Sequence, residues 1–483
     1  MRANKILRGI EILSIHGDPA ATEVRALTFD SRSVERGDAF FAVAGEKSDG
    51  HDYIPAAVQR GASAVVCQKL PQNSDPGVLW VEVADTNTAI GRAAGNFYDH
   101  PSTKLHLVGV TGTNGKTTTA TLLYNMFREL GYEAGLISTV TYCIGGRCFD
   151  STHTTPDAIR LNAMMAEMAD AGCEYCFMEV SSHSIVQRRI EGLTFAGGIF
   201  TNITHDHLDY HKTFAEYIRA KKTFFDNLPR KAFALVNVDD RNGRVMVQNT
   251  KADIKTYSFE TMADFRCKVV EMRMDGMLLE IDGTEVWVRF LGRFNAYNLL
   301  AVYGAATLLG ARKDEALKAL SGLGAVNGRF EYITSPEGVT AIVDYAHTPD
   351  ALQNVLDTVN DILPPERKLI VVVGCGGNRD AAKRPVMARI AATSSNLAIL
   401  TSDNPRLEDP DAIIEQMKEG LSKGDRYLAI TDRREAIRTA AMMASRGDVI
   451  LIAGKGHETY QDAGGVKHHF DDKEEIANAF NNK

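Results

Sequence analysis

A glycine-rich segment carrying a lysine and two threonines is the part of this chain with the most evident chemistry. Residues 109–118 read GVTGTNGKTT and follow the apolar run 105–108. A strand, a glycine loop, Lys-Thr and a helical pattern make the layout of a phosphate-binding loop, whose backbone N–H groups face phosphate oxygens. Lys116 would reach the outer phosphates, and the Thr117 hydroxyl would hold Mg²⁺. The segment therefore predicts a nucleoside triphosphate site, although Val110 stands where the usual loop has glycine or alanine.

Carboxylate and imidazole groups follow two further predicted strands. Glu179 lies near the end of one apolar run, and HDHLDYH, residues 205–211, comes after the next. Because ligands bind outside the carboxyl ends of strands in open α/β sheets, we expect Glu179 and His207 to share a Mg²⁺ ion held by ATP phosphates. Zinc is the alternative for the three histidines, but they have neither cysteine partners nor the H-E-x-x-H form. For His211, the alternative that it packs the turn as part of a hydrogen-bonded cluster stays open.

Three loops in the last third of the chain carry side chains of both charge signs. Each loop follows a predicted strand, and together they supply Arg379, Asp403, Arg406 and Glu458. Arginine takes a carboxylate through two N–H donors and acids take an ammonium, so the set suits a zwitterion. Surface ion pairs are the alternative, although three separate strand ends supply these groups. A phosphate loop and such a site together predict amide formation, in which ATP phosphorylates an acid and an amine attacks the acyl phosphate.

The apolar runs that must position these groups fall into three blocks. The predicted strands are 39–43, 64–67 and 78–83 in the first, 105–108, 175–180, 198–201 and 233–238 in the second, and 341–343, 368–373, 397–401 and 449–453 in the third. Strands that alternate with helices predict mainly parallel sheets, and residues 266–290 predict a small antiparallel patch. We therefore predict an α/β protein with a smaller N-terminal α/β domain (1–98), a central, mostly parallel domain like that of P-loop ATPases (99–330) and a C-terminal Rossmann-like open sheet (331–483).

Length, charge and cysteine content limit the class of protein. With 483 residues the chain is long enough for two or three domains, and its net charge of -8 argues against nucleic-acid binding. We find neither a signal-peptide-like stretch nor a membrane span, so we expect a cytoplasmic monomer without membrane insertion. The seven cysteines form no disulfide ladder, and Cys173 and Cys176 lack a second pair for zinc. We expect the cysteines to serve in core packing in a reducing compartment.

Seven short motifs resemble the Mur ligases of peptidoglycan synthesis in order and spacing, from about residue 24 to residue 461. They are TGTNGKT (111–117), EVSSH (179–183), residues 202–211, NAYN (295–298), Gly328-Arg329, DYAH (344–347) and Asp432-Arg433. The first is shared with folylpolyglutamate synthetases, which are one alternative. More specific are LTFDSR (27–32), HTTP (153–156) and DNPR (403–406), which resemble the branch of the family that adds the third amino acid.

The resemblance implies an ATP-dependent, ADP-forming amide ligase. The implied reaction adds meso-diaminopimelate to the D-glutamate of UDP-N-acetylmuramoyl-L-alanyl-D-glutamate through an acyl phosphate, with Mg²⁺ as cofactor and ATP as substrate. In the family, the DNPR sequence is associated with members that add diaminopimelate, and lysine-adding members have a different sequence there. A lysine-adding ligase is the alternative. Unpaired arginines would penalise lysine, which lacks the second carboxylate. A protein that binds the nucleotide without turnover is a further alternative.

By matching position, the resemblance also implies roles for individual residues. The implied catalytic residues are Lys116, Lys221 and His207, and the implied metal ligands are Thr117, Glu179, His207 and Lys221, the lysine that the family carbamylates. An exposed helix lysine is the alternative for Lys221. The implied ATP contacts are Gly112, Thr113, Asn114, Gly115, Lys116, Thr117, Thr118, Asn295, Arg329 and Asp344. The muramoyl nucleotide is assigned Phe29, Ser31, Glu46, Lys47, Ser48, His153, Thr154, Thr155, Ser181, Gln187 and Arg189. Diaminopimelate is assigned Arg379, Asp403, Asn404, Pro405, Arg406, Gly454 and Glu458.

Overall fold

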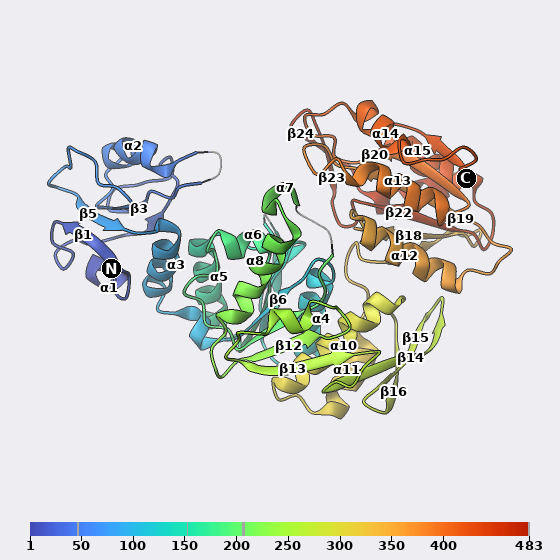
Figure 1. The fold of residues 1–483 in the computed structure, drawn as a ribbon, viewed down its shortest axis with the longest axis horizontal. Helices are drawn as coiled ribbons and strands as arrows, with labels where there is room; N and C mark the ends of the chain where they lie inside the picture. Colours follow the sequence, from blue (N-terminus) through green and yellow to red (C-terminus); the bar gives the residue numbers. More distant parts are fainter. Residues whose placement is uncertain (46–47, 152, 205–207, 482–483) are drawn as a thin grey trace.

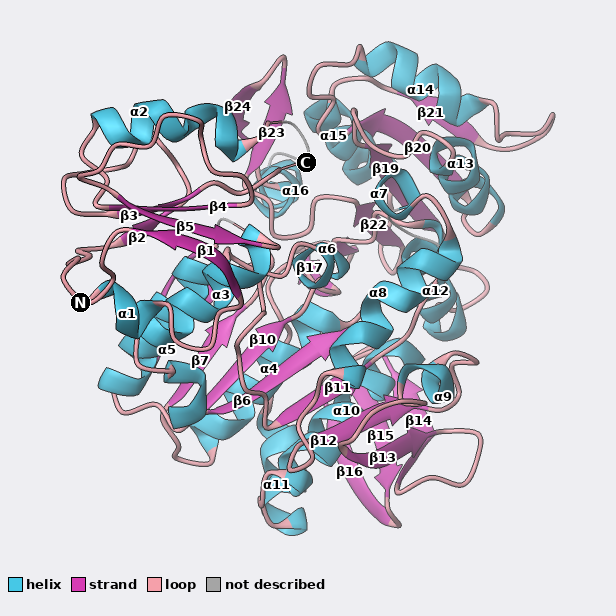
Figure 2. Ribbon diagram, turned by 60° about the vertical axis from the view of Figure 1, so that its left-hand side comes forward, coloured by secondary structure: helices cyan, strands magenta, loops and turns pink. Residues whose placement is uncertain are grey.

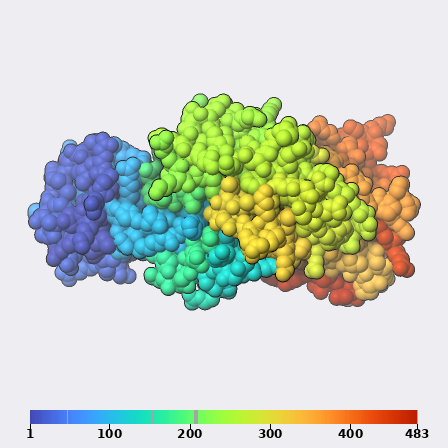
Figure 3. Space-filling model, turned by 90° about the horizontal axis from the view of Figure 1, so that it is seen from below, coloured from blue at the N-terminus to red at the C-terminus, as the bar shows by residue number. Residues whose placement is uncertain are grey.

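The computed structural model describes residues 1–45, 48–151, 153–204 and 208–481. Three large sheets, each made by a different stretch of the chain, follow one another along the longest axis of the molecule (Figure 1). The space-filling view shows the same order, with the N-terminal stretch at one end and the C-terminal stretch at the other (Figure 3). The α/β prediction is confirmed, whereas the boundaries at 98/99 and 330/331 stay predictions.

The N-terminal sheet has the strand order β1-β5-β4-β3-β2, and β1 alone runs antiparallel to its neighbour. Its elements are α1 (Ala3–Ile6), β1 (Ile12–His16), β2 (Leu27–Thr28), β3 (Ala39–Phe41), η1 (Gly50–Tyr53), α2 (Ile54–Gln59), β4 (Ala64–Cys67), β5 (Leu79–Val83) and α3 (Thr86–Phe97). All four residues of β4 are buried, as expected for a parallel strand covered on both faces. Helix α3 packs against the helix Ala158–Asp170 of the central stretch and so joins the two stretches.

The central sheet has eleven strands in the order β16-β15-β14-β13-β12-β11-β6-β10-β7-β8-β9. Its first elements are η2 (Pro101–Lys104), β6 (His106–Thr111), α4 (Lys116–Glu129), β7 (Ala134–Ile137), β8 (Thr141–Ile144), β9 (Arg147–Asp150), α5 (Ala158–Asp170), β10 (Tyr175–Glu179), α6 (Ser182–Val186), β11 (Gly197–Phe200), α7 (Leu208–His211) and α8 (Phe214–Asp226). Then follow β12 (Phe233–Asn237), α9 (Gly243–Met246), β13 (Asp253–Ser258), β14 (Phe265–Arg273), β15 (Gly276–Ile281), β16 (Thr284–Val288), α10 (Arg293–Leu308) and α11 (Lys313–Gly322).

The middle of the central sheet is parallel, and both of its edges are antiparallel. Strand β6 lies between β10 and β11 and runs parallel to both, so the glycine loop that follows β6 shares its sheet edge with the ends of these two strands. The predicted antiparallel patch is confirmed as β14, β15 and β16, and it continues the large sheet because β13 pairs with β14.

The C-terminal sheet has the strand order β17-β18-β22-β19-β20-β21, with β17 antiparallel at one edge. Its elements are β17 (Glu331–Thr334), β18 (Thr340–Asp344), α12 (Pro349–Ile362), β19 (Leu369–Cys375), α13 (Lys383–Thr393), β20 (Leu397–Ser402), α14 (Pro410–Lys418), β21 (Tyr427–Ala429), α15 (Arg433–Met443), β22 (Val449–Ala453), β23 (Tyr460–Ala463), β24 (Val466–His469) and α16 (Asp472–Asn481). Helices α12, α13 and α14 pack on one face and α15 and α16 on the other (Figure 2). This is the predicted Rossmann-like arrangement, and β23 and β24 add a separate hairpin.

Hydrogen bonds join the glycine loop to the C-terminal stretch and to Arg329, which shortly precedes that stretch. Asn114 Nδ2 donates to Asp350 Oδ2 at 2.8 Å, and Arg329 Nη2 donates to Thr117 Oγ1 at 3.2 Å. The first bond comes from the start of α12, which faces the loop across the junction. The loop is therefore in direct contact with the C-terminal stretch.

The prediction that the cysteines serve only in core packing is wrong for one pair. Cys143 and Cys148 form a disulfide between β8 and β9, where they are directly paired across the antiparallel hairpin with Cα atoms 4.1 Å apart. The turn between the strands brings opposed residues close enough for a bond, which their sequence spacing alone does not reveal. The other five cysteines are buried thiols. In the part of the chain that the structure describes, no helix is both long and apolar enough to cross a membrane.

Candidate active site

The glycine loop leaves no space for side chains at its two key turns. Gly112 has φ +156° and Gly115, which precedes the first residue of α4, has φ +85°. A Cβ atom on Gly112 would lie 1.9 Å from Thr201 Oγ1, and one on Gly115 would lie 2.4 Å from Asn298 Oδ1. Thr201 Oγ1 also donates to the Asn114 carbonyl at 2.6 Å. The loop is therefore held tightly against the end of β11, with the N-terminus of α4 behind it.

Two lysines reach the carbonyl oxygen of Gly112. Lys116 Nζ donates to it at 2.9 Å and to the Thr113 carbonyl at 2.8 Å. Lys221, on α8, donates to the same oxygen at 2.8 Å, and its Nζ lies 4.6 Å from the centre of the Tyr217 ring. Lys221 is only 1% exposed, so the alternative of an exposed helix lysine is wrong. Two cationic groups thus lie where a phosphate chain would meet the loop.

The carboxylate of Glu179 is suited to a cation. The residue is 1% exposed, and its Oε1 accepts from the Thr139 amide at 2.6 Å. Its buried Oε2 has no hydrogen-bond partner among the described residues. An unpaired buried carboxylate oxygen is costly, and Mg²⁺ prefers oxygen ligands and keeps several waters. Glu179 with the Thr117 hydroxyl therefore fits a Mg²⁺ ion that phosphates and water would complete.

Of the three histidines after β11, the structure describes only His211. His205 and His207 lie outside the described residues. His211 is buried and its Nε2 lies 2.8 Å from Ser182 Oγ, which agrees with the packing alternative for this residue. Among the described residues, no group of three or more His, Cys, Asp and Glu side chains could hold a metal ion.

Polar side chains continue from Glu179 toward α6. Thr155 Oγ1 donates to the Glu179 carbonyl at 2.8 Å, and Thr139 Oγ1 donates to Thr154 Oγ1 at 3.0 Å. Arg189 Nη1 donates to the Thr155 carbonyl at 2.7 Å, and its Nε donates to Gln187 Oε1 at 2.9 Å. These bonds link the HTTP segment, the end of β10 and the turn after α6 into one wall.

A cavity of about 850 Å³ collects most of the predicted site residues. It is lined from the central stretch by Thr113, Asn114, Gly115, Lys116, Thr117, Thr118, His153, Thr154, Thr155, Glu179, Ser181, Arg189, Lys221 and Asn295, and from the junction and the C-terminal stretch by Arg329, Asp344, Arg379 and Arg406. The phosphate loop and the two predicted arginines thus face the same space.

Other predicted residues lie elsewhere. Phe29, Ser31 and Ser48 belong to the N-terminal stretch and line neither described cavity, although the Phe29 ring is 44% exposed. Glu46 and Lys47 lie outside the described residues. Gly112, Gln187 and Pro405 line neither described cavity, although Gln187 accepts a hydrogen bond from Arg189, which lines the larger one.

Asp344 and Asn295 are both occupied by backbone contacts. Asp344 accepts from the Phe330 and Ala346 amides at 2.7 Å each, and burial raises the pKa of its carboxyl. Asn295 Nδ2 donates to the Leu291 carbonyl at 2.8 Å. Both residues line the large cavity, but their side chains also hold the local backbone.

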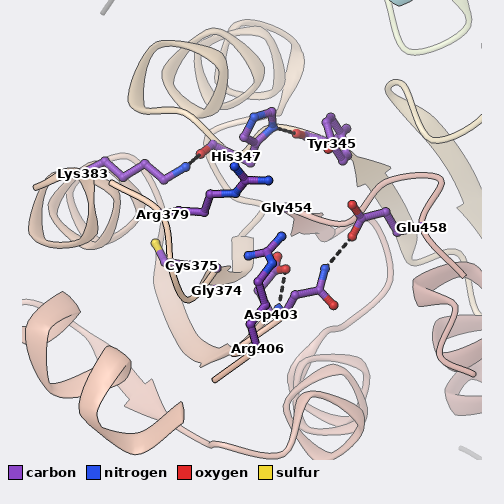
Figure 4. A pocket seen from close by; sticks show the side chains of 12 residues that line it. Tyr345, His347, Gly374, Cys375, Arg379, Lys383, Asp403, Arg406, Gly454 and Glu458 are labelled. Carbon is purple, nitrogen blue, oxygen red and sulfur yellow. Dashed lines mark hydrogen bonds between the residues drawn. The ribbon is translucent and has the colours of Figure 1, made fainter. Parts of the chain in front are cut away.

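A second, smaller cavity of about 60 Å³ lies among the strand ends of the C-terminal sheet (Figure 4). It is lined by six of the seven residues predicted for the amino acid: Arg379, Asp403, Asn404, Arg406, Gly454 and Glu458. Asn404 Nδ2 donates to Glu458 Oε2 at 2.7 Å, and the Asn404 amide donates to Asp403 Oδ1 at 2.6 Å. Burial and the neighbouring Asp403 raise the pKa of Glu458. The cavity therefore has one wall of acids.

The two arginines line this cavity as well. Arg406 Nη1 donates to the Gly377 carbonyl at 2.7 Å, whereas the Arg379 guanidinium has no hydrogen-bond or ion-pair partner among the described residues. In Figure 4, Arg379 and Glu458 lie on opposite sides of Gly454, and Arg406 overlaps Asp403 in this view. Acids and guanidinium groups in one cavity can hold an ammonium and a carboxylate of one molecule at the same time.

Three residues that line the cavities were not predicted as site residues from the sequence. Lys383 lines both cavities and its Nζ donates to the His347 carbonyl at 2.7 Å. Asp350 lines the large cavity, and burial raises its pKa. Both stand in the first turn of a helix, whereas the residues predicted for the amino acid lie in loops directly after strands. The DYAH motif contained His347 without indicating that it would line both cavities.

Three family models match consecutive parts of the chain. They are "Mur ligase family, catalytic domain" over residues 23–99, "Mur ligase middle domain" over 110–306 and "Mur ligase, glutamate ligase domain" over 328–456. Proteins of Phocaeicola vulgatus and Bacteroides fragilis, both named UDP-N-acetylmuramoyl-L-alanyl-D-glutamate--2,6-diaminopimelate ligase, are each 56% identical to it; the matches cover 100% and 99%, respectively, of both chains. The chain belongs to the Mur ligase family. This confirms the resemblance of its motifs, and the Mur ligase is therefore an ATP-dependent ligase of peptidoglycan precursor synthesis.

Solved structures place this Mur ligase in the same fold. A structure named for UDP-N-acetylmuramoyl-L-alanyl-D-glutamate--2,6-diaminopimelate ligase has a TM-score of 0.70 and 32% identity, over 100% of this chain and 99% of that one. A MurF ligase from Thermotoga maritima in complex with ADP has a TM-score of 0.64 and 20% identity, over 95% and 97% of the two chains. A folylpolyglutamate synthase of Mycobacterium tuberculosis has a TM-score of 0.61 and 16% identity, over 77% and 93%. The last two share the fold alone.

Proposed function

We propose that this Mur ligase joins meso-diaminopimelate to the D-glutamate of UDP-N-acetylmuramoyl-L-alanyl-D-glutamate, while ATP is split to ADP and phosphate. The observation that carries the proposal is that Arg379 and Arg406 line both the small cavity with its acid wall and the large cavity with the phosphate loop. An amino acid held by these groups would present its amine to an acid activated on the loop. The names of the full-length relatives support the same substrates.

In the first step, an oxygen of the D-glutamate side-chain carboxylate attacks the γ-phosphorus of ATP. A new P–O bond forms, the bond from phosphorus to the ADP oxygen breaks, and an acyl phosphate results. Lys116 is placed to bind the oxygens of the transferring group, and preorganised charge of this kind supplies most of the catalysis in phosphoryl transfer. Thr117 Oγ1, Glu179 Oε2 and His207 would hold Mg²⁺, which would supply positive charge beside the phosphates.

In the second step, one amine of diaminopimelate attacks the acyl carbon. The C–N bond forms, the C–O bond to the phosphate breaks, the amine gives up a proton and inorganic phosphate leaves. Asp403 and Glu458 are suited to the distant ammonium, and Arg379 and Arg406 to the distant carboxylate. Lysine lacks that carboxylate, so both guanidinium groups would stay unpaired in its complex, and a polar site rejects such an analogue strongly.

Lys221 is proposed to carry a carbamate. Its ammonium would lose a proton, and the neutral amine would then bond to the carbon of CO₂ and release a second proton, which converts the cationic side chain into an anionic one. The support is its place: it is buried, lines the large cavity and contacts Gly112 of the loop. Beside a phosphate loop, an anion at this position can orient Mg²⁺ or a water bound to it. The N-terminal stretch, with the exposed Phe29 ring, is proposed to bind the uridine diphosphate end.

The test is phosphate release from ATP with the UDP-muramoyl dipeptide and either meso-diaminopimelate, L-lysine or no amine. We expect release only with diaminopimelate. Release that is independent of the amine, or greater with lysine, would contradict the proposed substrate. A Lys116→Ala variant should be inactive, while Lys231→Ala, an exposed lysine that does not line the cavity, should match the wild type. Full activity of Lys116→Ala would refute the role given to the loop.

A further inference from the structure

The two arginines of the small cavity stand on different loops. Arg379 lies between β19 and α13, and Arg406 lies between β20 and α14. A Cβ atom on Gly376 would lie 2.9 Å from Arg406 Nη1 and 3.9 Å from Arg379 Cγ, so both side chains approach this glycine. Guanidinium groups that converge repel each other, and they do so more strongly away from bulk water. Their joint position therefore needs support from outside the cavity.

Arg406 is held in an unfavourable backbone conformation. Its φ of +53° is in the left-handed region, which non-glycine residues rarely adopt. Its amide donates to the Asp462 carbonyl at 2.9 Å, and its carbonyl accepts from the Gly464 amide at 2.6 Å. The hairpin of β23 and β24 thus fixes one side of the loop. Such strain persists only where the surroundings determine the conformation, and it collects at functional sites.

An ion pair fixes the other side and joins the two loops behind the cavity. The Arg384 side chain is 2% exposed; its Nη1 donates to Glu408 Oε2 at 2.8 Å, and its Nη2 donates to Glu408 Oε1 at 3.0 Å. Nη2 also donates to the Gly376 carbonyl at 3.2 Å. Glu408 Oε1 accepts from the Asn378 amide, beside Arg379 in the chain. The pair therefore connects the loop of Arg379 to the loop of Arg406, because Glu408 lies two residues after Arg406.

The pair is separate from the cavities themselves. Among the described residues, neither Arg384 nor Glu408 lines either cavity. The hydrogen bonds from Arg384 lower the pKa of Glu408, so the carboxylate stays charged at neutral pH. A charged, bidentate pair whose arginine is buried has a narrow range of geometries. It can transmit that geometry to the loops without contacting the amino acid.

We propose that Arg384 and Glu408 are positioning residues that set the spacing of Arg379 and Arg406, and through it the preference for an amino acid with a second carboxylate. This inference rests on the proposed function. With the pair intact, both guanidinium groups meet one carboxylate. Without it, the two loops can separate, and the site loses the carboxylate contact while the acid wall and the phosphate loop stay in place.

The test is the variant Glu408→Gln, which keeps the size of the side chain and removes its charge. We expect KM for meso-diaminopimelate to rise about tenfold or more, since displacements of about 1 Å have effects of this order. KM for ATP and for the muramoyl nucleotide should stay within about twofold of the wild type. The ratio of kcat/KM for diaminopimelate to kcat/KM for lysine should fall by the same factor as kcat/KM for diaminopimelate itself.

Two further variants separate positioning from stability. Glu475→Gln breaks a second bidentate pair in the same stretch, with Arg434 at 2.8 Å for both bonds, far from the loops in question. It should leave every KM unchanged. The double variant Arg384→Met/Glu408→Gln removes the unpaired buried charge, so its melting temperature should recover while KM for diaminopimelate stays high.

Three results would overturn the inference: an unchanged KM for diaminopimelate in Glu408→Gln, an equal rise in all three KM values, or a normal KM in the double variant. Wild-type enzyme that releases phosphate without diaminopimelate would instead refute the proposed substrate. The wild-type measurement therefore separates the failure of the substrate assignment from the failure of the positioning pair.

Discussion

Replacing Gly454 with alanine tests whether the acid wall of the small cavity binds the amino acid. The φ angle at Gly454 is +117°, and a Cβ atom there would lie 2.5 Å from Asp403 Oδ2. Ordinary contact begins at 3.4 Å, so the carboxylate must retreat by about 0.9 Å. This movement would disturb the 2.6 Å bond from the Asn404 amide to Asp403 Oδ1. The backbone conformation adds about 1–3 kcal/mol of strain for a residue with a side chain.

Gly424→Ala is the matched control. Gly424 has φ +110°, and a Cβ atom there would have nothing within 4 Å. Both variants should lose a similar amount of stability through the backbone, measured as the change in melting temperature. In the phosphate-release assay, Gly454→Ala alone should raise KM for diaminopimelate, by about 10- to 100-fold for a displacement near 1 Å. KM for ATP should stay the same in both.

The outcome that refutes this reasoning is specific. If KM for diaminopimelate in Gly454→Ala equals that of the wild type, Asp403 does not contact the amino acid. If Gly424→Ala raises this KM as much, the effect belongs to the stability of the whole C-terminal sheet. Crystallography of Gly454→Ala would then show whether Asp403 had moved.

Three other predictions concern buried charges. Lys221→Met should lower phosphate release by about 100-fold or more, and mass spectrometry in bicarbonate should find the added CO₂ of a carbamate on the wild type only; retained activity would contradict this. Asp472→Asn removes the charged partner of Arg433 in an ion pair whose side chains are both 0% exposed. Urea unfolding should therefore show that the free energy of unfolding falls by about 3–5 kcal/mol. A fall of less than about 1 kcal/mol would contradict this prediction. Burial and Arg329 lower the pKa of His457 from 6.5 to about 3, so the unfolded chain alone takes up this proton as the pH falls below 6.5. Wild-type stability should then decline toward pH 4, and His457→Gln should show a shallower decline in melting temperature; equal slopes would count against the assignment.

The strands could be predicted because buried parallel strands are continuous apolar runs. The predicted runs 175–180 and 449–453 match β10 and β22 to within one residue. The hairpin of β23 and β24 was missed, because most of its residues are polar and exposed and show no apolar alternation. The Cys143–Cys148 disulfide was missed because it depends on the strand register of the hairpin.

The site could be predicted where residues follow strands directly, and less well where long-range packing decides. Asp403 and Glu458 meet because β20 and β22 end at one edge of the sheet, as strand order in such sheets allows. Burial of Lys221 depends on how α8 lies against the loop, which a helix pattern does not reveal. The positioning pair of Arg384 and Glu408 had no sequence signal, since neither residue falls at a strand end.

Each sheet comes from one continuous stretch of chain, so the residues that select the amine can be transferred to another ligase as one segment. Every residue assigned to the amino acid lies between Arg379 and Glu458, inside the stretch that forms the C-terminal sheet. Exchange of residues 331–481 between related ligases should therefore carry amine choice into a new host in one piece. Contacts to preserve at the joint include Asn114 with Asp350 and Asn327 with Lys473. Hybrid enzymes that keep these two contacts offer a route to cell-wall peptides with altered third residues.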